Sequence, residues 1–166
     1  MKPQVAFTII TFTMILASIA VVTTGPVISA QYAGYSFVLE ASGQAYDRYG
    51  NPHSVDLSLS GTGYGSPTWY MSLRVASGTV KVDGSTFRII GGCGMLIQRY
   101  HYINLGIRIT PPYGGPITGC CMRGTSGVYY ANEIPLTLSS RYIILPTYPR
   151  YTILYNLRLT GEITLS

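Results

Sequence analysis

Apolar and polar side chains alternate residue by residue along most of the chain after residue 35, and this period of two limits the possible folds more than any other feature. It is clearest at the C-terminus, where polar residues separate Tyr155, Leu157, Leu159, Ile163 and Leu165. Successive side chains of a β-strand point to opposite faces, so this pattern predicts strands with one face in a core and the other in water. It recurs at 36–42, 55–60, 71–75 and 102–110, and more weakly at 117–123, 127–131, 134–139 and 142–145.

Turn signals interrupt the alternation at short intervals. The dipeptide Asp83-Gly84 lies between two alternating runs and accepts the positive φ angles of a type I′ turn, so it predicts a tight hairpin. Other breaks rich in Gly and Pro fall at 49–52, 63–67, 91–92 and 111–116. Short strands separated by such turns predict an all-β domain, either an antiparallel β-sandwich or a partly closed barrel of about eight to ten strands.

The first 30 residues have a different composition. No charged residue follows Lys2 until Glu40, and an apolar run at 5–22 precedes the Gly25-Pro26 break. This is typical of an export signal, with Ala30 as the cleavage position, but a helix over 5–24 would span about 30 Å and could also cross a bilayer. We expect a signal peptide or N-terminal membrane anchor helix at 1–30. A single extracytoplasmic domain would follow at 31–166, either secreted or held at the membrane through 5–24.

Charge and cysteine content set further limits. The net charge of +5 predicts a mild attraction to acidic surfaces, and nucleic acid is not an expected partner outside the cell. In an oxidising compartment the three cysteines permit one disulfide, between Cys93 and either Cys120 or Cys121, because neighbours on a strand point to opposite faces. The alternative, three buried thiols without a bridge, stays open.

The densest polar stretch runs from Asp47 to Asp56. Asp47, Asn51 and Asp56 are oxygen ligands suited to a hard cation such as calcium, and His53 lies between them. Their spacing does not match a calcium-binding EF-hand loop, and a solvated turn explains the same composition. We therefore predict no bound cofactor, and these four residues are the metal-ligand candidates.

Catalytic signatures are absent from the sequence. The chain has two histidines, His53 and His101, and contains no Gly-x-Ser-x-Gly, His-Glu-x-x-His or phosphate-binding glycine motif. The cysteine, histidine and methionine spacing also differs from that of a blue-copper site. We therefore expect no catalytic residue, although a triad assembled in space and a metal-binding protein or hydrolase stay open as alternatives.

Aromatic residues offer a different kind of site. Tyr64, Trp69 and Tyr70 lie near one turn and are candidates for contacting a glycan. Arginine precedes tyrosine four times, at 48–49, 99–100, 141–142 and 150–151. Each such pair points to opposite faces of a strand, so the two side chains can meet only where the dipeptide lies in a turn.

Two segments carry a resemblance to a known group of proteins. The stretch 42–61, SGQAYDRYGNPHSVDLSLSG, and the ending 157–166, LRLTGEITLS, resemble small exported β-proteins of ammonia-oxidising archaea, whose function is uncharacterised. The resemblance implies export and an all-β architecture and transfers no functional residue. We expect a structural or binding module of the cell surface, which would bind envelope glycan or self-assemble through the edges of its terminal strands.

Overall fold

The computed structural model describes residues 34–111, 116–147 and 150–166. Tyr32–Ser166 form one compact unit. The predicted signal or anchor helix lies outside the described residues. Within them, no helix is both long enough and apolar enough to cross a membrane.

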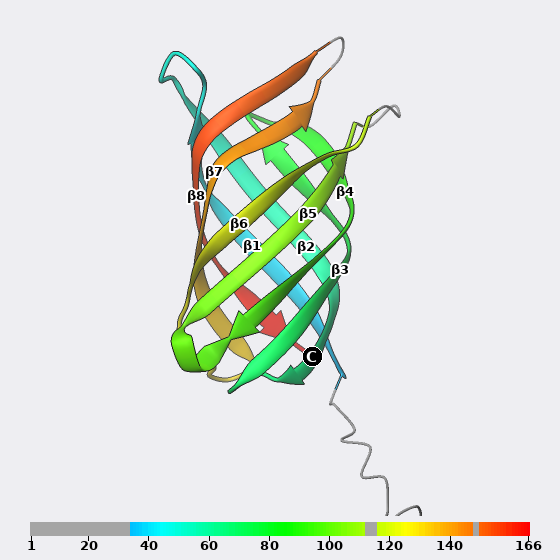
Figure 1. Ribbon diagram of the computed structural model, residues 1–166, viewed down its shortest axis with the longest axis vertical. Helices are drawn as coiled ribbons and strands as arrows, with labels where there is room; N and C mark the ends of the chain where they lie inside the picture. The colour runs from blue at the N-terminus through cyan, green and yellow to red at the C-terminus, as the bar shows by residue number, and fades with distance from the viewer. Residues whose placement is uncertain (1–33, 112–115, 148–149) are drawn as a thin grey trace, which may run out of the picture. The chain divides into compact units, whose positions relative to one another are not determined.

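The domain is an eight-stranded antiparallel barrel in which each strand pairs with the next one along the chain (Figure 1). A single 3-10 turn, η1 (Gln98–Tyr100), links the fourth and fifth strands. The strands are β1 (Gly34–Tyr46), β2 (Pro52–Ser66), β3 (Tyr70–Val82), β4 (Ser85–Ile97), β5 (Tyr102–Thr110), β6 (Thr118–Ser126), β7 (Glu133–Pro146) and β8 (Tyr151–Leu165). The prediction of an all-β domain is confirmed. Of the two predicted architectures, a sandwich and a partly closed barrel, the structure has a barrel, and its closure is complete.

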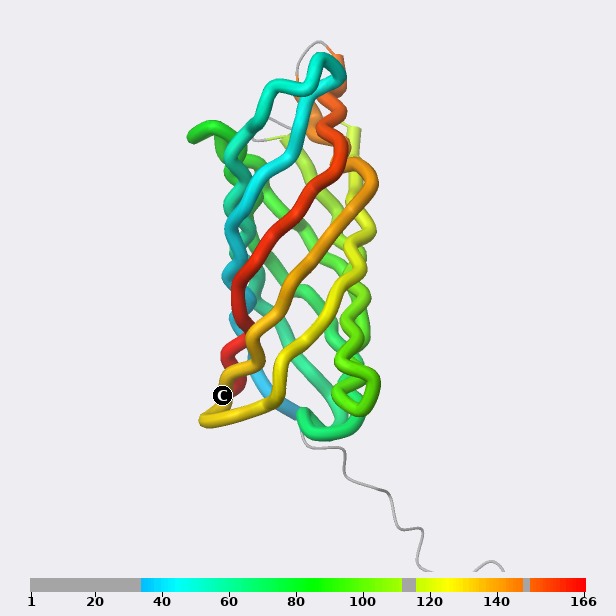
Figure 2. Tube along the Cα trace, turned by 90° about the vertical axis from the view of Figure 1, so that its left-hand side faces the viewer, coloured from blue at the N-terminus to red at the C-terminus, as the bar shows by residue number. Residues whose placement is uncertain are grey.

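The terminal strands close the barrel. β1 pairs with β8 from Phe37 opposite Leu165 to Tyr46 opposite Tyr155, and Figure 2 shows the two strands side by side. Since β1 also pairs with β2, and β8 with β7, the hydrogen-bonding edges of both terminal strands are used inside the barrel. Assembly by strand donation would require this seam to open first.

The inward faces of the strands fill the barrel with apolar side chains. The largest fully buried ones are Phe37, Leu39, Leu59, Met71, Leu73, Ile89, Leu96, Ile103, Leu105, Ile109, Met122 and Ile134. An eight-stranded barrel is just wide enough for side chains to fill its interior. The barrel is therefore held together by a packed core, and its polar chemistry lies on the outer surface.

Most of the predicted strand segments are present. Asp83 and Gly84 have φ angles of 47° and 83° and form the predicted tight hairpin between β3 and β4. The segments 134–139 and 142–145 are parts of the single strand β7, because no turn separates them. The segment 127–131 is not a strand: it forms the β6–β7 turn, closed by an isolated bridge between Tyr130 and Glu133.

The predicted inward position of Tyr155 is wrong. Leu157 and Leu159 are buried as predicted, but Asn156 has a positive φ of 53°, and the alternation of β8 changes phase there. Leu154 consequently takes the inward position and Tyr155 is exposed. The register between β1 and β8 shifts at the same level.

Candidate functional site

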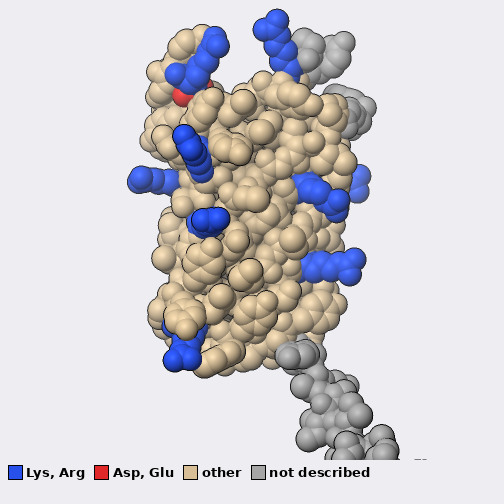
Figure 3. Space-filling view, in the orientation of Figure 1, with Lys and Arg blue, Asp and Glu red and all other residues tan. Residues whose placement is uncertain are grey.

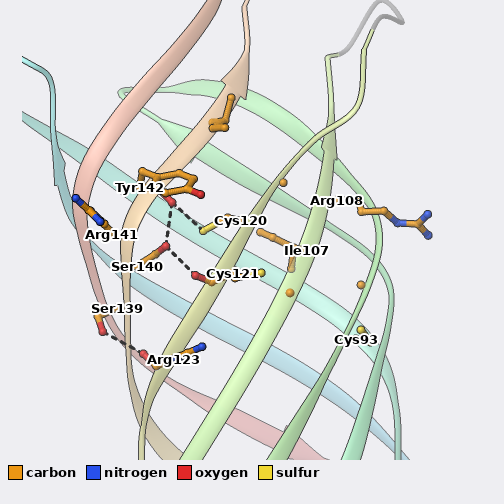
Figure 4. A pocket seen from close by; sticks show the side chains of 14 residues that line it. Cys93, Ile107, Arg108, Cys120, Cys121, Arg123, Ser139, Ser140, Arg141 and Tyr142 are labelled. Atoms are coloured by element: carbon orange, nitrogen blue, oxygen red, sulfur yellow. Dashed lines mark hydrogen bonds between the residues drawn. The ribbon is translucent and has the colours of Figure 1, made fainter.

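A shallow groove of about 920 Å³ lies on the outer surface of β4 to β7. Gly92, Gly106 and Gly119 are among the residues that line it, so part of its base is backbone. Around them stand the side chains of Cys93, Arg108, Cys121, Arg123, Ser139, Ser140, Arg141 and Tyr142 (Figure 4). We call this feature the arginine groove.

The groove follows a stretch where β6 and β7 lie side by side without a regular ladder. Backbone pairing between them covers only Arg123–Ser126 and Leu136–Ser139. Beyond it, three side chains replace the missing ladder bonds: Thr118 Oγ1 donates to Ile144 O (2.7 Å), Cys120 Sγ to Tyr142 O (3.5 Å) and Ser140 Oγ to Cys121 O (2.8 Å). The alternation of β7 changes phase at Arg141 and Tyr142, which both point outward, so its peptide groups no longer match those of β6.

The three cysteines are free thiols, and the predicted disulfide is not present. Cys93 and Cys121 both point outward, but Gly106 of β5 lies in register between them, so they are two strand spacings apart, about 10 Å. A disulfide needs Cα atoms within about 7 Å. Cys120 points into the barrel, where burial raises the pKa of its thiol to about 11.

Three guanidinium groups give the arginine groove its charge. Arg108, Arg123 and Arg141 are exposed, and no carboxylate is among the residues that line the groove. In the described part of the chain, both ion pairs involve His53, and no arginine is paired with a carboxylate. Figure 3 shows Lys and Arg side chains spread over this face, with acidic atoms only near its upper end. Unpaired arginines on one face form a site for anions.

The predicted metal-ligand candidates are only partly brought together. Asp47 accepts hydrogen bonds from the backbone N–H groups of Tyr49 and Asn51 and from the Asn51 amide, so it caps its own turn. His53 Nε2 lies 3.9 Å from the Asp47 carboxylate. Asp56 is on the outer face of β2, paired with Ser42 and Lys81, away from this turn.

Asp83, from the β3–β4 hairpin, completes the cluster that the sequence left incomplete. Its Oδ2 lies 2.5 Å from His53 Nδ1, and its Oδ1 accepts a hydrogen bond from the Ser54 N–H. The side-chain bond with His53, followed by the bond from Ser54, lowers the pKa of Asp83, and the bonds from Asn51 and Tyr49 lower that of Asp47. No group of three or more His, Cys, Asp or Glu side chains in the described ranges is arranged to hold a metal ion. The cluster ties two turns together.

The three predicted glycan-contacting aromatics lie at the end of the barrel where β1 begins. The Tyr64 ring lies near Gly34 of β1, Trp69 is in the β2–β3 turn, and Tyr70 is the first residue of β3. All three side chains are exposed. The guanidinium of Arg99 lies over the Trp69 ring at 5.2 Å and near the Tyr100 ring at 5.8 Å. Arg99 and Tyr100 belong to η1, so their side chains meet because the dipeptide lies in a turn.

Sequence reasoning missed the arginine groove. Its residues come from four strands, and no local motif joins Arg108, Arg123 and Arg141, which strand register places around one groove. Figure 4 shows the Arg108 side chain at one edge of the groove, extending away from Arg123 and Arg141. The signal in the sequence was that Arg108 and Arg123 occupy outward-facing positions of their alternating segments. The arrangement can bind an anion through guanidinium donors, whereas the Ser139 and Ser140 hydroxyls already donate to backbone carbonyls. The groove contains no pair of side chains arranged as nucleophile and base.

Comparisons with known proteins give no relative. No family model matches the chain, and neither the curated proteins nor the solved structures contain a match. The resemblance to exported archaeal β-proteins therefore rests on the two segments quoted above. Any function must be argued from the site itself.

Proposed function

We propose that the protein is an extracytoplasmic binding module for an acidic polysaccharide of the cell envelope, held in the arginine groove. The observation that carries this proposal is a groove lined by Arg108, Arg123 and Arg141 with no carboxylate among its lining residues. Export is supported by the apolar, uncharged run at 5–22.

The packed interior leaves the outer surface of the barrel as the place where a ligand can bind. Apolar side chains fill the space enclosed by the strands, so the barrel offers its polar groups outside. The groove is open and shallow, which suits an extended polymer that lies across several strands. Glycines at its base let a chain approach the backbone closely.

Guanidinium groups favour carboxylate and sulfate ligands. Each has a planar fork of N–H donors that can form two parallel hydrogen bonds to one acidic group. The hydroxyl oxygens of Ser139 and Ser140, whose hydrogens donate to backbone carbonyls, can accept hydrogen bonds from sugar hydroxyls, and Tyr142 adds a ring on which a sugar can lie. Because the arginines are exposed, each contact contributes modestly, and binding should weaken as salt increases.

The test uses polygalacturonate as the acidic polymer and dextran as the neutral one. Polygalacturonate should bind and dextran should not, as measured by isothermal titration calorimetry. At about 0.5–1 kcal/mol for each exposed contact, R108Q/R123Q/R141Q should bind the acidic polymer about 10–100-fold more weakly.

A control variant with two substitutions separates the groove from net charge. Arg88 is an exposed outward residue of β4 that does not line the groove, and Arg48 lies in the β1–β2 turn. R48Q/R88Q should retain binding within a factor of about two. Equal loss in both variants would mean that bulk charge, and not this groove, attracts the polymer; absence of any binding would reject the proposal.

A second candidate, self-assembly, is favoured by the acidic side of the barrel. Glu40, Asp56 and Glu162, together with one cation, Lys81, line a depression over β8, β1, β2 and β3, roughly opposite β5 and β6 in the strand order. The basic groove of one copy can face the acidic side of the next, and such a head-to-tail contact builds an open chain of copies. Sedimentation velocity at low and high salt tests this: salt-sensitive oligomers that disappear in E40Q/E162Q support assembly, and a monomer at low salt excludes it.

A further inference from the structure

Exposed aromatic side chains gather at the end of the barrel where β1 begins. Trp69, Tyr100 and Tyr130 are 58%, 70% and 81% exposed. They extend from three turns: β2–β3, η1 and β6–β7. With Tyr64, Tyr70 and Val128, which are also exposed, they form what we call the aromatic platform.

The three turns of the platform are joined to one another by Gln98, a buried polar residue. Its backbone N–H donates to Trp69 O at 2.9 Å, which ties η1 to the β2–β3 turn. Its side-chain amide donates to Gly127 O, and Ser126 Oγ donates to Gln98 Oε1 at 3.3 Å, which ties η1 to the β6–β7 turn. The aromatic side chains therefore stand on a fixed base, and binding need not order the loops first.

Charge is sparse at this end. In the turns 67–69, 98–101 and 127–132, all described, Arg99 is the one charged side chain, and it stacks on Trp69 and Tyr100. The opposite end carries Asp47, Arg48 and Asp83 in its β1–β2 and β3–β4 turns. The first residue of β7, Glu133, adds a carboxylate beside Tyr130. The two ends thus differ in chemistry: the turns of one are aromatic with a single cation, and those of the other carry charges of both signs.

We propose that the aromatic platform rests on the surface of a lipid bilayer. Trp and Tyr concentrate at membrane interfaces because their rings enter the boundary of the acyl region while N–H and O–H groups remain hydrated. Arg99 would remain at the level of the lipid phosphates. The barrel would then stand on the membrane with its charged end outward and the arginine groove on its side.

The chain outside the described residues supports a lipid partner over a soluble one. The run at 5–22 is apolar, and no charged residue occurs between Lys2 and Glu40. The chain enters the barrel at Gly34, at the platform end (Figure 1). Residues 25–33 can span at most about 30 Å, so a bilayer that held the apolar run would lie within reach of the platform.

Vesicle binding tests this proposal with the chain 32–166, which avoids the apolar run. This part is a compact unit whose core begins at Phe37, so it contains everything the barrel needs to fold. Trp69 is the single tryptophan of the chain and reports directly from the platform. With phosphatidylcholine vesicles we expect its fluorescence to shift to shorter wavelength and the protein to sediment with the lipid.

Matched variants locate the contact while keeping the reporter. Y100S/Y130S should lower the partition into vesicles about tenfold, because less aromatic surface enters the interface. Y49S/Y151S removes two exposed tyrosines from the opposite end, 73% and 52% exposed, and should bind as the parent does. Circular dichroism must give the same spectrum and melting temperature for all three.

Each remaining result contradicts the proposal. No spectral shift and no sedimentation rejects a lipid partner, and equal loss in the two variants rejects the platform as the contact. A shift with polygalacturonate but not with vesicles makes the platform a glycan site. The inference is independent of the proposed function, because R108Q/R123Q/R141Q should still bind vesicles and Y100S/Y130S should still bind polygalacturonate.

Discussion

Replacing Gly161 with alanine tests the closure of the barrel. Gly161 is in β8 and pairs with Ala41 of β1 on one side and Leu136 of β7 on the other. A Cβ atom at this position would lie 1.9 Å from Glu40 O and 2.5 Å from the Ala41 Cα. Both are backbone atoms of the neighbouring strand, so no side-chain rotation can relieve the clash.

The size of the effect follows from this geometry. The new Cβ falls more than 1 Å short of the 3.0 Å that real Cβ atoms keep, so β1 and β8 must separate locally. Overpacking costs about 1–3 kcal/mol, and weakening the adjacent ladder hydrogen bonds adds about 1 kcal/mol. We expect Gly161→Ala to lower the free energy of unfolding by about 3 kcal/mol and the melting temperature by roughly 10 °C.

Thermal and urea unfolding of the chain 32–166, followed by circular dichroism, measure this loss. Gly34→Ala is the matched control, because a Cβ there meets only the Tyr64 ring, at 3.7 Å and 3.9 Å, an ordinary contact. It should change stability by less than about 0.5 kcal/mol. A loss below about 1 kcal/mol for Gly161→Ala would mean that β1 and β8 do not approach closely, and the closed barrel would be refuted.

Three further outcomes follow from the side-chain environments. Glu40 lies directly opposite Glu162, so E162K should raise the urea midpoint by replacing repulsion with attraction, and high salt should reduce the gain. The lowered pKa of Asp83 contributes stability above its ordinary value of 3.8 that is lost as the pH falls further, so D83N, which also removes the charge that faces His53, should flatten the acid side of the melting-temperature profile. Burial of Cys120 predicts that iodoacetamide at neutral pH labels only the other two cysteines, as mass spectrometry would show, with the third labelled after unfolding; full labelling of the folded protein would contradict it.

Local pattern was sufficient to predict most inward-facing residues. Val55, Leu57 and Leu59 in β2, and the row from Ile103 to Ile109 in β5, are buried as their alternation predicts. Tyr155 is the exception, since a positive φ at Asn156 reverses the phase. Asparagine tolerates this conformation more readily than most residues, but its presence alone does not identify where the reversal occurs.

The sites depended on pairings between distant residues. His53 and Asp83 are 30 positions apart and meet because β2 and β3 pair in a particular register. The separation of Cys93 from Cys121 is likewise set by Gly106, which lies in register between them. Sequence spacing does not reveal such a register, so the possible disulfide and the four metal-ligand candidates were chosen without it.

The sequence by itself determined that this chain forms strands with one apolar face, because the period of two fixes where each side chain points relative to its neighbours. It also determined the tight hairpin at Asp83-Gly84, where residue chemistry selects the turn. Only the tertiary structure decided that β8 returns to β1 and closes the barrel, because that contact joins the two ends of the domain through backbone groups that every residue has. The arginine groove and the aromatic platform follow from this closure and register, which bring side chains from separate strands and turns onto one surface.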